Sequence, residues 1–210
     1  MIRHIFRSGQ AEADRVEAFS DGVLAIVITL LVLEITPPSA PGGEAELWRA
    51  LARLLPVIGA WVVSFLFVLV FWVSHHYLFA SLAKVDRGVL WLNGLFLLFI
   101  SFTPFPMALQ ARYPGTVPAA FLLSLAMLLT ASSFALLRWY ASIDAGLLRP
   151  GIATRVAREA MRRSLLAPSL YLIGTLAAFV LPWVSLVIQV IVPLIFILPH
   201  RVDSEAGREP

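Results

Sequence analysis

The sequence predicts an all-α, polytopic membrane protein with six transmembrane helices. The chain has 210 residues, of which 60% are hydrophobic and only 14% are charged. The apolar residues gather in long runs that lack charge, each about as long as the ~20 residues that a helix needs to cross the hydrocarbon of a bilayer. Such a composition does not suit a water-soluble globule. There is no cysteine, which excludes disulfides and thiolate chemistry.

The order of the runs gives the order of the helices. The first begins near Phe19, and three charge-free runs follow. A last run, Ser164–Pro199, has 36 residues and is too long for one helix, but Pro182 interrupts it, because proline breaks a helix interior. We therefore expect a single domain, residues 1–210, with a polar tail at 201–210. The predicted spans are about 17–36, 52–79, 88–111, 114–138, 163–181 and 183–199.

Positive charge sets the orientation. An even number of spans leaves both termini on one side of the membrane. Thirteen of the sixteen Lys and Arg residues lie on that side, in the N-terminal arm, the turn at 81–89, the segment 138–163 and the tail. Cytoplasmic loops are rich in Lys and Arg, so we expect a multi-pass protein of the cell membrane with both termini in the cytoplasm.

The loops differ in character. Residues Thr36–Glu46 read as an outer loop because proline and glycine punctuate them. In the basic segment 138–163, Arg155, Arg158 and Arg162 recur at helical spacing. A helix on the inner leaflet that touches anionic lipid heads is favoured over a ligand-binding patch. Topology thus explains the basic excess, and we expect no nucleic-acid partner.

No pattern in the chain indicates catalysis. His75 and His76 are adjacent and point to different helix faces, so they cannot form a metal-binding pair on one face. The chain has no HExxH or GxSxG motif and no glycine-rich phosphate loop. We therefore expect no enzyme, no cofactor and no fixed metal ion.

Two acids lie unusually close together in the first span. Only twelve uncharged residues separate Asp21 from Glu34, so their Cα atoms are about 20 Å apart, less than the ~30 Å hydrocarbon core. Charged groups in a membrane normally face protein, water or each other. For Asp21, a structural carboxylate held by Arg15 or by a histidine of the second span is favoured over an ion ligand. Ser20 and Asp21 also suit the N-terminal end of a helix.

The first span carries an apolar stripe of Val23, Ile26, Leu30 and Leu33, spaced as one helix face. Asp21 lies about 140° around the axis from Ile26 and so does not share that face. Any apolar helix yields such a stripe, and core packing is its usual reason. From spacing alone, packing and pore lining both stay open, with packing the commoner case.

Three motifs resemble those of the endolysosomal potassium channel family (transmembrane protein 175). "RVEAFSDG", Arg15–Gly22, is similar to the RxxxFSDG signature of that family. "FWVSHHYLF" at Phe71–Phe79 and "LNGLFLLFISFTPFPMAL" at Leu92–Leu109 are similar to its second and third spans. Three motifs in order on consecutive spans are specific, and the chain resembles a prokaryotic member with one six-helix repeat.

The resemblance implies a cation channel permeable to potassium, without a TVGYG filter. It implies a homotetramer in the lipid bilayer, with the first helix of each subunit lining a central pore. The family's constriction is the apolar residue five positions after the signature aspartate, which is Ile26. Leu30 and Leu33 match further rings, and Thr29 matches a position where a hydroxyl faces the conduction path. Four copies of Ile26 would form a hydrophobic gate.

The resemblance also implies a structural network at the cytoplasmic side that pins the first span against the second. Its core would be Arg15, Asp21, Trp72 and His76, and Asn93 on the third span could join it. The signature residues assigned to it are Arg15, Phe19, Ser20, Asp21, Gly22, Trp72, His76 and Asn93. His76 is a candidate pH sensor, because histidine changes charge near neutral pH, although a structural histidine is the commoner case.

Some alternatives stay open at this point. Glu34 would form an acidic ring at the outer mouth, or it is an ordinary interfacial carboxylate; both are equally supported. A proton-conducting channel is one alternative function, because a narrow apolar pore can hold transient water wires. An ion-coupled secondary transporter is another, although it should show inverted repeats and a polar midplane site. The last alternative is a protein that acts in assembly or lipid binding and transports nothing.

Overall fold

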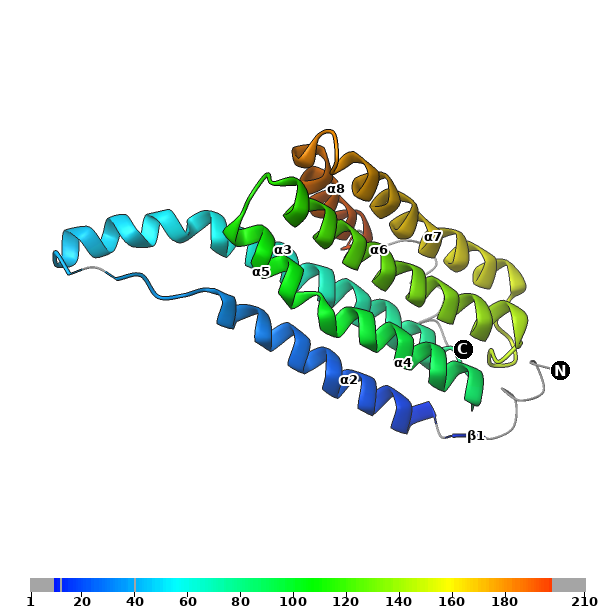
Figure 1. Ribbon diagram of the computed structural model, residues 1–210. Coiled ribbons are helices and arrows are strands. Elements are labelled where there is room, and N and C mark those ends of the chain that lie inside the picture. The colour runs from blue at the N-terminus through cyan, green and yellow to red at the C-terminus, as the bar shows by residue number, and fades with distance from the viewer. Residues whose placement is uncertain (1–9, 12, 40, 198–210) are drawn as a thin grey trace.

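The computed structural model describes residues 10–197 apart from 12 and 40. It is an elongated helical bundle (Figure 1). Its helices are α2 (Ala13–Leu30), which continues into the 3-10 turn η1 (Leu31–Glu34), α3 (Glu44–Ala80), α4 (Arg87–Phe102), α5 (Pro104–Arg112), α6 (Val117–Trp139), which ends in the π-turn η2 (Tyr140–Asp144), α7 (Thr154–Ala177) and α8 (Pro182–Ile197). A two-residue antiparallel pair, β1 (Gln10–Ala11) with β2 (Val85–Asp86), closes one end.

Within the described residues, four helical segments are long and apolar enough to cross a membrane. They are Ala13–Glu34, Glu44–Ala80, Arg87–Arg112 and Val117–Asp144. The fifth predicted span, α7, carries several arginines, and the sixth, α8, is apolar but has only 16 residues, about 24 Å. The all-helical membrane fold is confirmed. Six crossings, and the side on which the termini lie, stay predictions.

The second helix is longer than its apolar run. α3 has 37 residues, about 55 Å, and begins at Glu44 rather than at the predicted 52. The predicted outer loop is therefore shorter than Thr36–Glu46. Glu44 and Glu46 lie in the first turn of α3, where acids complement the helix dipole. In Figure 1 the first part of α3 projects well beyond the ends of α5, α6 and α8.

The third predicted span is a kinked pair rather than one helix. α4 ends at Phe102 and α5 starts at Pro104. Pro104 has no backbone N–H to continue the ladder, and the Thr103 hydroxyl donates to the Ile100 carbonyl at 2.7 Å instead. The "TPFP" sequence therefore bends the span.

The basic segment is part of a long helix. Arg155, Arg158 and Arg162 belong to α7, which runs without a break from Thr154 to Ala177. The expected helix is therefore present, and it is continuous with the fifth predicted span because neither glycine nor proline interrupts the first half of α7. Its contact with the lipid heads of the inner leaflet stays a prediction. The turn near Pro182 lies where expected, with Pro182 in the first position of α8. The predicted end of the last span at 199 and the tail 201–210 lie outside the described residues.

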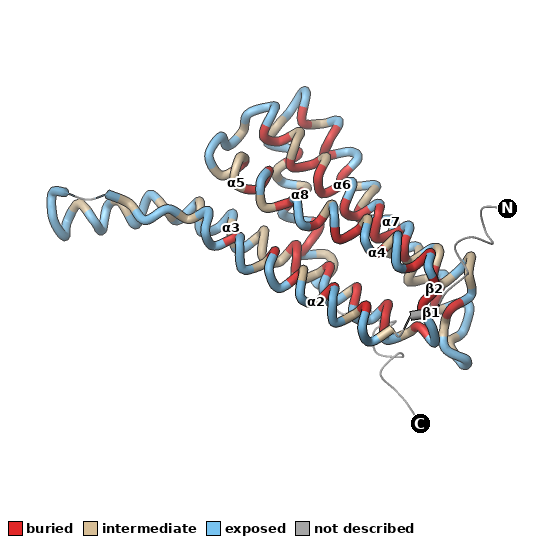
Figure 2. Tube along the Cα trace, turned by 60° about the horizontal axis from the view of Figure 1, so that its bottom comes forward, coloured by how far each residue is buried: buried red, intermediate tan, exposed pale blue. Residues whose placement is uncertain are grey.

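Aromatic side chains fill the centre of the bundle. The rings of Phe67 and Phe71 on α3 are 5.0 Å apart between centroids, and Phe71 lies 5.7 Å from both Phe96 on α4 and Phe134 on α6. Such edge and tilted pairs stabilise by about 0.5–1.5 kcal/mol beyond area burial. Figure 2 shows buried residues along the middle of the bundle and exposed ones along the projecting part of α3. The core therefore holds α3, α4, α6 and α7 together, with α2 on its flank.

Asp86 fixes the connection at the predicted cytoplasmic end. Its carboxylate accepts the Val89 N–H at 3.0 Å as an N-cap of α4 and the Tyr140 hydroxyl at 2.8 Å. A Cβ on Gly88 would collide with the Tyr140 ring, so a larger residue there would force that ring to move. This close approach joins the start of α4 to the end of α6.

Candidate pore helix and its polar anchor

α2 has a buried face and an exposed face. Its buried side chains recur at helical spacing: Val16, Ser20, Leu24, Val27 and, in η1, Leu31. They pack on α3 and α4. The opposite side of α2 meets no part of the described chain.

The predicted stripe lies mostly on the exposed face. Ile26 is 60% exposed, Leu30 44% and Leu33 73%. Val23, which the sequence places on the same stripe, is partly buried and packs against the core. Packing in the chain's own core therefore does not explain Ile26, Leu30 and Leu33. An exposed apolar stripe on a membrane helix faces lipid, another subunit or a pore.

Thr29 and Glu34 are also exposed. The Thr29 hydroxyl donates back to the backbone, with the Ala25 and Ile26 carbonyls each 2.9 Å away. Its oxygen lone pairs are thus left facing outward. Glu34 ends η1, at the end of α2 predicted to be extracellular.

A buried chain of hydrogen bonds joins three helices. His75 on α3 lies 2.9 Å, through Nε2, from the Asn93 Oδ1 on α4. The Asn93 Nδ2 donates to the Ser20 Oγ on α2 at 2.8 Å, and Ser20 donates in turn to the Val16 carbonyl at 2.8 Å. Because Oδ1 can only accept, the proton of the His75 ring lies on Nε2.

A second, exposed set of contacts lies beside it. The Trp72 indole N–H donates to the Asp21 Oδ1 at 2.9 Å. The His76 Nδ1 lies 2.8 Å from the Glu17 Oε1. The rings of Trp72 and His76 stack with a centroid distance of 6.1 Å. These contacts hold the first half of α2 against the second half of α3.

The structure rearranges the predicted network. His76 pairs with Glu17 rather than with Asp21, and the buried position belongs to His75, which sequence reasoning missed. The signal was present: His75 shares the apolar face of α3 with Phe71 and Phe79, whereas His76 is one residue off that face. Glu17 was missed as well, although it lies one turn before Asp21.

Three predicted members lie outside the hydrogen-bonded network. Arg15 is exposed and has no hydrogen bond or ion pair with the described residues. Phe19 is 65% exposed, on the same side of α2 as Ile26. Gly22 is exposed, and a Cβ added to it would meet no atom within 4 Å. The signature therefore divides into residues that anchor α2 and residues that leave its outer surface open.

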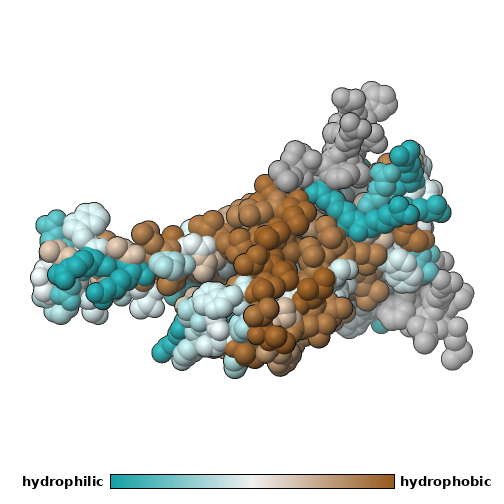
Figure 3. All heavy atoms as spheres, turned by 90° about the horizontal axis from the view of Figure 1, so that it is seen from above, coloured by the Kyte–Doolittle hydropathy of each residue, from teal (hydrophilic) through white to brown (hydrophobic). Residues whose placement is uncertain are grey.

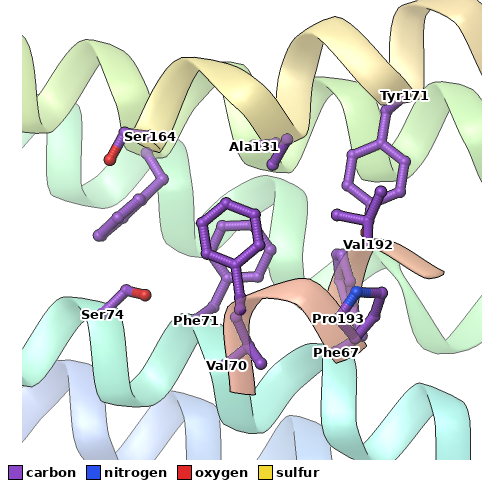
Figure 4. A pocket seen from close by; sticks show the side chains of 12 residues that line it. Phe67, Val70, Phe71, Ser74, Ala131, Ser164, Tyr171, Val192 and Pro193 are labelled. Atoms are coloured by element: carbon purple, nitrogen blue, oxygen red, sulfur yellow. The ribbon is translucent and has the colours of Figure 1, made fainter. Parts of the chain in front are cut away.

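A small apolar cavity lies away from α2, between α3, α6, α7 and α8 (Figure 4). Ser74 and Ser164 lie at one end of it, and Tyr171, Val192 and Pro193 at the other. Its volume is about 30 Å³, enough for about two water molecules. It is a packing defect of the bundle, too small to conduct ions.

Sequence comparison identifies the family. A family model described as the endosomal/lysosomal potassium channel TMEM175 matches residues 15–104, which include α3, α4 and all but the first two residues of α2. A potassium channel of Streptomyces collinus is 41% identical over 175 residues, covering 80% of this chain and 84% of the relative. The chain belongs to the TMEM175 family. This family is one of ion channels, so the chain is a membrane ion channel and not an enzyme.

Other members agree over nearly the whole length. A potassium channel of Chamaesiphon minutus is 37% identical over 199 residues, covering 90% of this chain and 95% of the relative. The crystal structure of a TMEM175 homologue from the same organism, described as a lysosomal potassium-selective channel, matches with a TM-score of 0.76 at 32% identity. It covers 93% of this chain and 98% of that one. The mouse endosomal/lysosomal proton channel TMEM175 is 28% identical and matches over 39% of its own length.

Replacing Asp21 with alanine is expected to lower stability without changing ion preference. The substitution removes the acceptor of the Trp72 indole N–H, and a hydrogen bond to a charged group contributes about 1.5–3 kcal/mol, less where it is partly exposed. Thermal unfolding in detergent measures the loss, and Asp21→Asn, which keeps an acceptor oxygen, should lose less. If Asp21→Ala folded normally and altered selectivity, the anchoring role would be wrong.

Proposed function

We propose that this chain is a potassium-permeable cation channel of the cell membrane, formed by four copies with α2 of each lining a central pore. The observation that carries the proposal is the exposed apolar stripe on α2, within a chain of the TMEM175 family. In the single chain Ile26, Leu30 and Leu33 are without partners in the bundle. If four copies surround a central axis lined by their α2 helices, the four Ile26, the four Leu30 and the four Leu33 side chains form successive rings.

The narrowest ring is assigned to Ile26. Four branched apolar side chains would make a constriction that excludes water, as in a hydrophobic gate. A potassium ion sheds its hydration at a lower free-energy cost than the smaller sodium ion. An apolar constriction without coordinating oxygens therefore favours potassium modestly. The outward lone pairs of Thr29, one turn after Ile26, would contribute oxygen contacts.

Small residues on α2 support close packing between subunits. Ala18, Gly22 and Ala25 are exposed and lie beside the stripe at small-residue spacing. Small residues let membrane helices approach closely. A neighbouring subunit packed on this edge would bring the four Ile26 side chains near the axis. The open space at Gly22 fits such an approach.

The remaining site residues take supporting roles. Glu34 at the end of η1 would form an acidic ring that raises the local cation concentration at the outer mouth. Ser20, Asn93 and His75 would fix the position of α2 without touching ions. The distribution of arginine supports a cytoplasmic position of both termini through the positive-inside rule.

Proton conduction is the second candidate. The observation that favours it is the mouse relative, whose name is that of a proton channel. A constriction of isoleucine that wets transiently would pass protons along a water wire. The chain belongs to a family of ion channels, and no observation favours an ion-coupled transporter.

Reconstitution in liposomes distinguishes these functions. Purified protein in potassium-loaded vesicles should pass current down a potassium gradient, with a smaller current when sodium replaces potassium at the same ionic strength. Empty vesicles prepared in the same way are the control. A current that follows only the proton gradient would show proton conduction and would contradict potassium permeation. Saturable flux coupled to a second solute would overturn the channel mechanism.

A further inference from the structure

The part of α3 that projects from the bundle has no other helix of the described chain packed along it. We call residues Glu44–Ile58 the arm. α2 and η1 stop at Glu34, and segment 35–43, whose described residues form no helix or strand, links them to the tip of the arm. Figures 1 and 2 show the arm standing clear of every other helix, with its residues exposed or half-buried.

The arm is amphipathic. Its large aliphatic residues lie within an arc of about 100° on a helical wheel. They are Leu47, Leu51, Leu54, Leu55 and Ile58. Three charged residues, Glu46, Arg49 and Arg53, fall on the opposite side, whereas Glu44, at the tip of the arm, falls on the apolar side. Figure 3 shows the hydrophilic residues together on one face of the arm. Leu55 is 64% exposed, and Leu47 and Leu51 are 40% exposed.

This pattern fits neither lipid nor water. A helix surrounded by lipid is apolar on all sides, and residues 44–53 of the arm, which include four charged side chains, are not. An amphipathic helix that lies on a membrane runs in its plane, whereas the arm continues, as one helix that includes Pro56, into the part of α3 that crosses the bundle. The apolar face of the arm therefore needs protein to cover it.

The same face of α3 holds α2 further along. His76, which contacts Glu17 on α2, follows Ile58 by eighteen residues, which is five full turns. Trp72, which contacts Asp21 on α2, follows Leu47 by twenty-five residues, only about 20° short of seven turns. The arm thus presents its leucines on the side on which α2 lies. Beyond the end of α2 this side is uncovered, because segment 35–43 leaves the leucines exposed.

We propose that the arm packs against the arms of neighbouring copies and forms a parallel four-helix collar around the outer mouth. This inference rests on the proposed tetrameric pore, in which the α2 side of α3 faces the axis. Leu47, Leu51, Leu54 and Ile58 are spaced four, three and four residues apart, the spacing of a coiled-coil seam. The partner of each arm is the arm of another copy of this chain.

Single-cysteine crosslinking tests the collar, because the chain contains no cysteine. Leu51→Cys places a thiol in the seam, and Arg53→Cys places one on the opposite side of the same turn. Each full-length variant is reconstituted in liposomes and treated with copper phenanthroline or a short bismaleimide. Covalent dimers of Leu51→Cys should form at least about tenfold faster than those of Arg53→Cys. Leu55→Cys, on the same face, repeats the test.

Crosslinking at the proposed pore tests the tetrameric assembly independently of the collar. Ile26→Cys should crosslink between subunits if α2 surrounds the axis. Crosslinking of Ile26→Cys without that of Leu51→Cys and Leu55→Cys would overturn the collar and leave the tetrameric pore intact. Equal rates for Leu51→Cys and Arg53→Cys would also overturn it. If neither Ile26→Cys nor Leu51→Cys crosslinked, both the collar and the assembly on which it rests would be wrong.

Discussion

Ile26→Asn is expected to raise the potassium current and to bring the potassium-to-sodium permeability ratio close to one. In the proposed pore, four isoleucines set the dehydration barrier, and four amides would let water stay at the constriction. Each ~1.4 kcal/mol taken from the barrier raises the rate of ion passage about tenfold. Currents across planar bilayers under paired potassium and sodium gradients measure both effects.

Val32→Asn is the matched control for this change. Val32 is an exposed apolar residue of η1 that lies off the stripe, and it takes the same substitution. Its conductance and ion preference should stay near those of the unmodified chain. If Ile26→Asn and Val32→Asn behaved alike, Ile26 would not be the constriction, and the pore would have to be sought along another face.

Asn93→Leu is expected to lower the free energy of unfolding by about 1–3 kcal/mol. Asn93 is the link between α4 and both α3 and α2, and leucine of similar size can neither accept from His75 nor donate to Ser20. The Nδ1 of His75 already has no partner among the described residues, so the buried ring would lose its remaining hydrogen bond. Thermal or denaturant unfolding in detergent, followed by circular dichroism, measures the loss.

Ser101→Ala on the same helix is the control for Asn93. Ser101 is exposed, and its hydroxyl bonds only to the Leu98 carbonyl of its own helix. It should change stability by a few tenths of a kcal/mol. Channels of Asn93→Leu that do assemble should keep the potassium preference of the unmodified chain. Equal stability of the two variants would show that the three-helix chain of hydrogen bonds does not anchor α2.

The sequence by itself determined the class of the protein and the stripe on α2. Charge-free runs of about 20 residues are the length of membrane-spanning helices. In a helix every backbone N–H and C=O group is bonded within its own segment, as the absence of water in lipid requires. Proline set the turn before α8 because it cannot continue a preceding helix. The spacing of Ile26, Leu30 and Leu33 is local, so periodicity alone placed them on one face. The RxxxFSDG signature is likewise a local pattern.

Only the tertiary structure decided which polar groups meet. His75 and His76 are neighbours in sequence, and their roles differ because a helix turns 100° between them, which points one into the core and the other toward Glu17. The separation of Asn93 from Ser20 by 73 residues is bridged only when α2 and α4 pack together. Phe19, inside the signature, is exposed because it lies on the side of α2 that faces away from α3 and α4. The unpartnered face of the arm also appeared only in three dimensions, because hydropathy shows that its residues are apolar but not that α2 ends before it can cover them.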